Sequence, residues 1–189
     1  MLKVIKSNDK DSQLIKEALK NNRRAQQQLY EKYAPKMLGL CKFYIKDLQQ
    51  AEEIMLNGFF KVFTKLATFK NEGSFEGWIK RIMIWESISF LRKKSKLVYI
   101  DDLSYFEKAE EIPEENLISI ENIQNYIDEL PDACKVIFNL YVIEEYKHSE
   151  IAALLNITEG TSKTQLFRAR KALQKMLITN KSNYHATQI

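Results

Sequence analysis

The side chains whose chemistry most clearly suggests a function lie near the C-terminus, and they are basic and hydroxyl groups. Residues 159–181 hold six basic residues and a single acid, Glu159. Clustered cations neutralise phosphates, and hydroxyl or amine groups near a helix N-terminus can contact the edges of bases. This composition predicts binding to a nucleic acid rather than catalysis.

A helix, a tight turn and a second helix must position these groups. We expect one helix over about 147–155, with the small residue Ala152 where the two helices cross. Asn156 tolerates the left-handed conformation that a helix end often needs, and Thr158 can cap the helix over 159–177. The pattern HSEIAALLNITEGTSKTQLFRARKAL therefore predicts a helix-turn-helix whose second helix reads DNA.

The predicted contacts divide along this second helix. Those near its start would meet base edges: Thr158, Gly160, Thr161, Lys163 and Thr164. Those further along suit phosphates: Arg168, Arg170 and Lys171. Ser162 is expected on the packed side. The alternative is an ordinary helical hairpin whose charged face is merely solvated.

The sequence offers little for an enzyme. It has no phosphate-binding Gly-rich loop, no nucleophile motif and no cluster of metal-ligand residues, so we expect no cofactor and no metal. Cys41 and Cys134 are expected to be buried thiols in a reducing compartment. His148 is expected to be a surface residue rather than a catalyst, and the paired acids at 52–53 and 101–102 are poor acid/base candidates.

Composition and charge predict an all-α chain of two small domains. The 189 residues are 45% hydrophobic and include only 5 Gly and 3 Pro, which argues against a turn-rich β fold. Net charge is +10 over residues 1–100, −6 over 101–120 and zero over 121–189. We expect domains at 1–96 and 121–180, an acidic flexible linker at 97–120 and a polar, frayed tail at 181–189. With no apolar run of membrane-spanning length and no signal peptide, a cytoplasmic location is expected.

The N-terminal part reads as a series of helices. They are expected over 12–20, 23–33, 36–45, 48–66 and 75–94. The second should stop near Pro35, because proline disfavours helix in the residue before it. Asp47 is a good N-cap for the helix that follows, whose apolar residues recur at spacings of three and four. This buried face comprises Ala51, Ile54, Met55, Phe59, Val62, Phe63 and Leu66.

Two stretches in order resemble the sigma-70 family, extracytoplasmic-function (ECF) group. DLQQAEEIMLNGFFKVFTKLATFKNEGSFEGWIKRIMIWESISFLRKK resembles its second conserved region, and LPDACKVIFNLYVIEEYKHSEIAALLNITEGTSKTQLFRARKAL its fourth. The resemblance implies a non-enzymatic sigma factor that binds core RNA polymerase. Its N-terminal domain would open the −10 promoter element, and its C-terminal domain would recognise the −35 element.

The resemblance also implies roles for residues of the N-terminal domain. The helix over 48–66 resembles the helix that docks on the clamp coiled coil of the largest polymerase subunit. Its exposed face would comprise Asp47, Gln50, Glu52, Glu53 and Asn57. The family often carries Gln-Glu where this chain has Leu56 and Asn57.

The loop over 71–75 resembles the segment that captures a base flipped out of the −10 element. The residues implied in −10 binding and melting are Asn71, Ser74, Phe75, Lys80, Arg81, Trp85, Arg92 and Lys93. Trp85 stands where the family commonly has Asn. The alternative for the aromatic residues Phe75, Trp78, Trp85 and Phe90 is a helical core stripe, which we favour for Trp78.

The remaining expectations concern partners and rival functions. The polymerase flap would be a further contact, many relatives are held by an anti-sigma factor, and no small-molecule substrate is implied. The acidic linker would imitate nucleic acid in the channel that RNA later fills, or serve as a solvated tether. One rival is a stand-alone helix-turn-helix regulator that binds duplex DNA without polymerase. Another is a structural helical protein with no nucleic-acid role.

Overall fold

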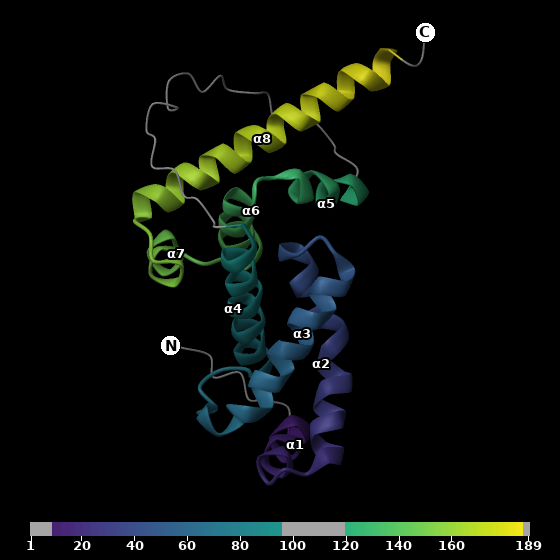
Figure 1. Ribbon diagram of the computed structural model, residues 1–189, viewed down its shortest axis with the longest axis vertical. Helices are drawn as coiled ribbons and strands as arrows, with labels where there is room; N and C mark the ends of the chain where they lie inside the picture. The colour runs from purple at the N-terminus through teal and green to yellow at the C-terminus, as the bar shows by residue number, and fades with distance from the viewer. Residues whose placement is uncertain (1–8, 96–119, 187–189) are drawn as a thin grey trace. The chain divides into compact units, whose positions relative to one another are not determined.

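The computed structural model describes residues 9–95 and 120–186, and every regular element within these ranges is a helix (Figure 1). The all-α prediction is confirmed. The chain divides into two compact units, residues 1–94 and 95–189. The predicted linker, apart from Ile120, lies outside the described residues. Within the described ranges, no helix combines the length and the apolar character that a membrane span requires.

The first unit is built on one long helix, α2. Its elements are α1 (Asp9–Leu19), α2 (Arg23–Tyr44), α3 (Leu48–Thr64), the short 3-10 helix η1 (Leu66–Thr68) and α4 (Phe75–Ser95). Both α1 and α3 pack along α2 (Figure 1). The Tyr33 hydroxyl of α2 donates to the buried Asp11 carboxylate of α1 over 2.8 Å. Burial and this carboxylate raise the pKa of Tyr33, and the hydrogen bond joins α1 to α2.

The predicted helix break at Pro35 is wrong, because α2 continues through it. Proline inside a helix removes one hydrogen bond and costs about 3 kcal/mol. Pro35 lies on the exposed side of α2, while Tyr33 and Met37 on either side of it are buried. Burial of this continuous apolar face outweighs the local preference of proline.

The face predicted to be buried on the helix over 48–66 is buried, with Phe63 at its half-exposed edge. Opposite it, α4 contributes Ile79, Met83 and Ile88, each fully buried. A side chain at Gly58 of α3 would collide with the Met83 sulfur. The glycine therefore leaves room for the Met83 side chain of α4 against α3.

The second unit contains α5 (Ile120–Glu129), α6 (Asp132–Phe138), the π-helical η3 (Asn139–Ile143), α7 (His148–Leu155) and α8 (Glu159–Ala186). The sequence predicted neither the π-helical turn nor the length of α8, which was expected to end near Leu177. Residues 181–186, expected to fray, belong to α8.

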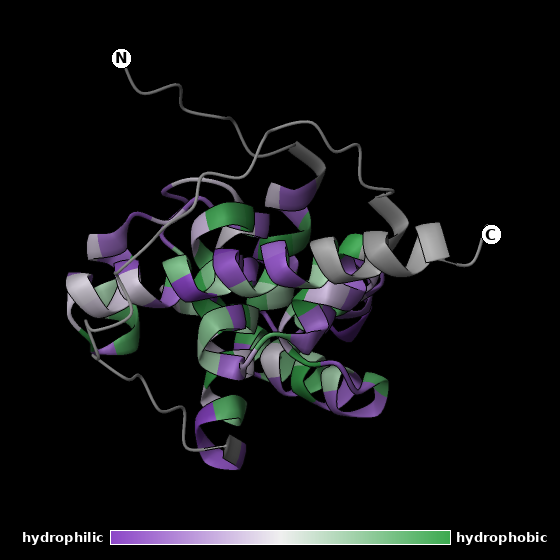
Figure 2. Ribbon diagram, turned by 90° about the horizontal axis from the view of Figure 1, so that it is seen from above, coloured by the Kyte–Doolittle hydropathy of each residue, from purple (hydrophilic) through white to green (hydrophobic). Residues whose placement is uncertain are grey.

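The core of the second unit joins α6, η3 and α7 to the inner face of α8. Its fully buried residues include Val136, Ile137, Leu140, Ile151 and Ala169. Figure 2 shows hydrophobic and hydrophilic residues on the same helices, as expected where only one face is packed. Both thiols are free and buried as predicted, and burial raises the pKa of Cys41 to about 11.

Candidate nucleic-acid interface

The turn between α7 and α8 has the predicted geometry. Asn156 ends α7 with φ 55° and ψ 51°, in the left-handed region. The amides of Asn156 and Ile157 both donate to the Ala152 carbonyl, the latter over 3.0 Å. These bonds close the turn, so α7 and the start of α8 lie side by side (Figure 1).

Thr158 caps α8 as predicted. Its hydroxyl accepts a hydrogen bond from the Thr161 amide over 3.0 Å, and it lies 2.8 Å from the Thr161 hydroxyl. Its carbonyl accepts from the Ser162 amide over 3.1 Å. Glu159, in the first turn, places its carboxylate near the positive end of the helix dipole. These contacts fix the start of α8, from which its exposed polar face extends.

Five of the predicted contact residues on α8 are exposed or half-buried. Gly160 and Lys163, near the start, are exposed, and so is Arg170 further along. Arg168 and Lys171 are half-buried, and the Lys171 ammonium lies 5.4 Å from the centroid of the Phe167 ring. These positions fit a helix whose start meets bases and whose later turns meet phosphates.

Two of the predicted base-edge residues require correction. Thr161 is 3% exposed and Thr164 is 2% exposed. The Thr164 hydroxyl donates to the Gly160 carbonyl over 2.9 Å, and the Thr161 hydroxyl is engaged with the cap. Threonine hydroxyls inside a helix commonly turn back to its own backbone, and these two are not presented to a base.

Ser162 faces inward, as predicted, and is fully buried. Its hydroxyl lies 2.9 Å from Nδ1 of His148, the first residue of α7. His148, expected to be a surface residue rather than a catalyst, is half-buried, and its ring is engaged with Ser162. This pair was not predicted, because the two residues lie fourteen positions apart and on different helices.

In the first unit, the loop before α4 holds two of the predicted −10 residues at its surface. Asn71 is exposed and has φ 57°, a conformation that asparagine tolerates. The exposed Ser74 caps α4 by accepting from the Gly77 amide over 3.0 Å. Both side chains are accessible beside the start of α4.

Phe75, predicted to contact the −10 element, is instead part of the core and only 2% exposed. Its ring packs edge-on against Tyr33 and Phe69, with centroids 5.7 and 5.2 Å apart. Trp78 is half-buried and stacks on Phe75 at 5.8 Å, in agreement with the core reading favoured for it. The aromatic residues at the start of α4 therefore anchor the helix.

Further along α4, the predicted −10 residues share an outward stripe. Arg81, Trp85 and Arg92 recur at spacings of four and seven, which places them along one side of a helix. Trp85 is 43% exposed, so the core alternative does not apply to it. Lys93 is exposed, and Lys80 is half-buried. An indole between two guanidinium groups is an arrangement that can stack on bases and pair with phosphates.

The exposed face of α3 contains the predicted acidic and polar residues and two apolar residues that the prediction missed. Glu52, Glu53 and Asn57 are exposed. Between them lie Leu56, 54% exposed, and Phe60, 70% exposed. Their four-residue spacing, on the side opposite the buried face, is the sequence signal that marks them.

The two remaining predicted residues of this face also have structural roles. The exposed Asp47 caps α3 by accepting from the Gln50 amide over 2.8 Å. The Gln50 side chain accepts from the Lys94 ammonium of α4 over 3.0 Å. These contacts hold the start of α3 against the end of α4.

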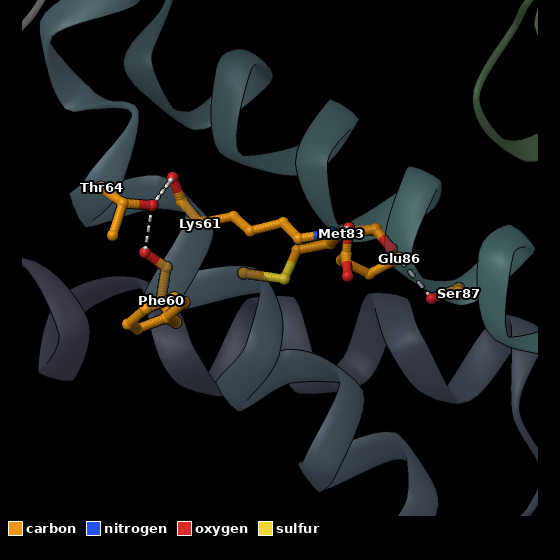
Figure 3. A network of polar contacts seen from close by, with 6 residues as sticks. All are labelled: Phe60, Lys61, Thr64, Met83, Glu86 and Ser87. Carbon is orange, nitrogen blue, oxygen red and sulfur yellow. Dashed lines mark hydrogen bonds and ion pairs between the residues drawn. The ribbon is translucent and has the colours of Figure 1, made fainter.

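A cross-helix ion pair joins α3 to α4 (Figure 3). The Lys61 ammonium lies 2.6 Å from the Glu86 carboxylate, which is 15% exposed. Met83, one turn earlier on α4, fills the space over Gly58. Glu86 would otherwise place a negative charge beside the outward stripe of α4, and Lys61 compensates it.

Comparison with known families matches both units. Residues 29–97 match the family described as Sigma-70 region 2, and residues 120–173 match Sigma-70, region 4. Among curated relatives, the ECF RNA polymerase sigma factor SigW of Bacillus subtilis is 30% identical, with 86% of this chain and 94% of SigW covered. The RNA polymerase sigma-H factor of Pseudomonas aeruginosa is 28% identical, with 89% and 94% covered.

Two solved structures share the fold. CnrH, determined in complex with the cytosolic domain of CnrY, has a TM-score of 0.52 and 17% identity. The match covers 89% of this chain and 97% of the CnrH chain. RpoE of Bartonella quintana, determined in complex with the anti-sigma factor NepR, has a TM-score of 0.53 and 19% identity. The match covers 80% of this chain and 95% of the RpoE chain.

Proposed function

The chain belongs to the ECF group of the sigma-70 family of RNA polymerase sigma factors, and from this premise we propose how its two units divide the work. As a sigma factor it binds core RNA polymerase and directs initiation at promoters, by recognising the −35 and −10 elements and opening the latter. The observation that supports the division is that the two sigma-70 regions fall on the two compact units, in order.

The second unit would anchor the −35 element as duplex DNA. Gly160 and Lys163 lie at the exposed start of α8, where a recognition helix approaches base edges. Arg168, Arg170 and Lys171 would neutralise phosphates on either side of the major groove. Thr158 contributes as the cap that fixes this start.

The first unit would hold the −10 element as a single strand. The stripe of Arg81, Trp85 and Arg92 offers one stacking surface between two cations. Lys80 and Lys93 add phosphate contacts, and Asn71 and Ser74 form the exposed edge beside which a flipped base would lie. Stacking on an aromatic ring is worth about 1–3 kcal/mol per base, which offsets the cost of unstacking it.

The exposed face of α3 would dock on the clamp coiled coil of the largest polymerase subunit. Leu56 and Phe60 supply the apolar centre, and Glu52, Glu53 and Asn57 surround it. Such an arrangement, with apolar anchors inside a polar rim, is typical of protein interfaces. Asp47 and Gln50 support this surface from its edge.

The remaining features extend the proposal. The acidic segment 97–120 would pass through the RNA channel of the polymerase, and region 4 would also contact the flap. CnrH and RpoE were each determined with a bound partner, and an anti-sigma factor is proposed for this chain on that basis. The protein would act in the cytoplasm, beside the polymerase, and perform no catalysis itself.

Run-off transcription with core polymerase from the source bacterium tests the proposal. The template is a library of genomic fragments, and transcript starts are sequenced with and without this protein. New starts that share upstream motifs at −10 and −35 spacing are expected. The stand-alone regulator would instead bind duplex DNA without core polymerase and produce no new starts.

Two variants test the assignment of surfaces. Replacing Leu56 and Phe60 together by alanine is expected to weaken binding to core polymerase about tenfold, because apolar anchors dominate interface energy. Leu19→Ala is the matched control, since Leu19 is exposed to a similar degree on α1. Lys163→Ala is expected to reduce transcription that depends on the −35 element about tenfold, as loss of one base contact does.

A further inference from the structure

Ser162 raises a question that the DNA-binding surface does not answer. It is 0% exposed, and its hydroxyl faces α7, the other helix of the helix-turn-helix. A buried hydroxyl is costly unless it is hydrogen-bonded. Its partner is Nδ1 of His148, 2.9 Å away, so the first residue of α7 is joined to the second turn of α8.

The His148 ring is itself held in place. It stacks on Tyr141 of η3, with ring centroids 4.5 Å apart and planes inclined by 23°. The Arg170 guanidinium of α8 lies 6.0 Å from the centroid of the same Tyr141 ring. Tyr141, His148, Ser162 and Arg170 therefore form one group, called here the His148 cluster, that joins η3, α7 and two turns of α8.

The His148 cluster borders the proposed base-contact residue directly. Lys163 follows Ser162 in the sequence and is exposed, so any rotation of α8 that moved the serine would also turn this side chain. Base contacts depend on direction, because a bidentate pair requires both hydrogen bonds to align. Phosphate contacts tolerate more displacement, since charge attraction has little angular dependence.

Charged groups of a neighbouring helix face His148. From α8 these are Lys163, Arg170 and Glu159. On its own helix, the Glu150 carboxylate is bonded to the Lys147 amide, and η3 contributes the uncharged Tyr141 ring. Burial and then Lys163 lower the pKa of His148, with Arg170 acting in the same direction against Glu159. The ring is therefore neutral near pH 7 and available to pair with a hydroxyl.

We propose that His148, acting through Ser162, is a positioning residue that sets the rotation of α8 and thereby the preference of this sigma factor for its −35 sequence. This inference rests on the proposed −35 function of the second unit. It assigns to a residue outside the DNA-contacting face a role in discrimination between promoters rather than in binding strength.

The test uses holoenzyme reconstituted from core polymerase and the full chain, on two matched templates. One holds a promoter recovered by mapping transcript starts, and the other has its upstream element scrambled. The ratio of their transcripts measures −35 discrimination. His148→Phe keeps the ring stacked on Tyr141 but leaves the Ser162 hydroxyl without its partner, and it is expected to lower the ratio about five- to tenfold.

Two further variants separate positioning from general stability. His148→Phe combined with Ser162→Ala replaces both polar partners by apolar groups, so no hydroxyl is left buried without a partner, but the directional bond is still missing. Its ratio is therefore expected to stay about five- to tenfold below that of the wild type, as in His148→Phe. Gln174→Ala, an exposed change on the same helix, should leave the ratio unchanged. Binding to core polymerase and output from the scrambled template should stay at the wild-type level in all three variants.

Each outcome decides the matter. A lower ratio in both His148→Phe and the double variant supports the positioning role, whereas restoration in the double variant overturns it, because the unpaired Ser162 hydroxyl alone would then be the cause. An unchanged ratio overturns it, and so does an equal fall on both templates, which would indicate damage to the fold alone. Failure of the proposed function is distinguishable, because the wild-type holoenzyme would then show no preference between the two templates.

Discussion

The two helices proposed to contact DNA are held to their units by opposite kinds of side chain. The inward face of α4 is apolar apart from Ser87, with Ile79, Ile84 and Ile88 almost fully buried. The first turns of α8 bury polar residues instead, each 3% exposed or less. Of these, Ser162 is hydrogen-bonded to His148 of α7 and Gln165 accepts from the Cys134 thiol of α6, while Thr161 and Thr164 bond within α8 and its cap. Apolar burial has no preferred direction, whereas hydrogen bonds need alignment.

This difference matches what each helix is proposed to bind. A single strand stacked on Trp85 can slide by a fraction of a base without losing the contact, because every base has an aromatic face. A duplex is read by directional hydrogen bonds to base edges. A helix that reads a duplex therefore benefits from a packed face with a single orientation, and the polar face of α8 provides one.

The largest expected effect tests the apolar half of this comparison. Gly58→Val places two methyl groups where Met83 now lies, and overpacking of this kind costs about 1–3 kcal/mol. We expect the free energy of unfolding of the first unit to fall by about 1–3 kcal/mol, measured by chemical denaturation, because the fully buried Met83 thioether must move aside.

Gly39→Ala provides the matched control for Gly58→Val. A Cβ at Gly39 meets no atom within 4 Å, so alanine in this helix interior should stabilise by about 1 kcal/mol. Gly58→Val combined with Met83→Ala should recover part of the loss. If Gly58→Val proved as stable as the wild type, packing of the Met83 side chain over Gly58 would not contribute to the stability of the first unit.

The next effect concerns the stripe on α4. Trp85→Ala is expected to reduce opening of the −10 element about tenfold, since one stacked base is worth about 1–3 kcal/mol. Permanganate reactivity of unpaired thymines measures the opening. Lys163→Ala should instead reduce −35 discrimination and leave opening on an already bound promoter unchanged. If both variants affected the same step, the proposed division between the two units would be wrong.

The comparison also shows which features the sequence could predict. The buried face of α3, the Asn156 turn and the Thr158 cap follow from local spacing and conformational preference, and each has the predicted form. The helix break at Pro35 was predicted wrongly because burial of Tyr33 and Met37, on either side of the proline, decides the continuity of α2. Local rules fail where tertiary packing decides.

The site residues divide in the same way. Charged side chains such as Lys163, Arg81 and Lys93 are exposed where the helical period placed them. Phe75, Thr161 and Thr164 were predicted to contact DNA from family resemblance or helix position, but all three are buried. An aromatic ring packs in a core as readily as on a base, and a threonine hydroxyl can bond to its own helix backbone. The His148–Ser162 pair could not be predicted, because it depends on how α7 crosses α8.

A smaller effect concerns how the stability of the second unit depends on pH. The pKa of His148 lies below its ordinary value of 6.5 in the folded state, so the unfolded chain takes up this proton first as pH falls. The stability contributed by His148 is therefore complete above pH 6.5 and declines as pH drops below it. Hydrogen exchange between pH 7.5 and 5.5 should show α7 and α8 losing protection more steeply in the wild type than in His148→Phe. Equal slopes would mean that His148 has the same pKa in both states.

The smallest effect concerns backbone strain at the entrance to α7. Glu145 has φ 58°, and this exposed residue ends the turn that leads from η3 to α7. A residue with a Cβ in this conformation costs about 1–2 kcal/mol, and glycine removes this cost. Glycine also makes the unfolded chain more flexible, which cancels part of the gain.

Glu145→Gly is accordingly expected to stabilise the second unit by about 0.5 kcal/mol, read as slower hydrogen exchange in α7 and α8. Glu145→Ala removes the same carboxylate without relieving the backbone, and it should not stabilise. In the first unit, Asn71→Gly at φ 57° should change little, because asparagine already tolerates this region. Equal gains from glycine and alanine would trace the effect to the lost charge, and the turn before α7 would then impose no strain on the helix that His148 begins.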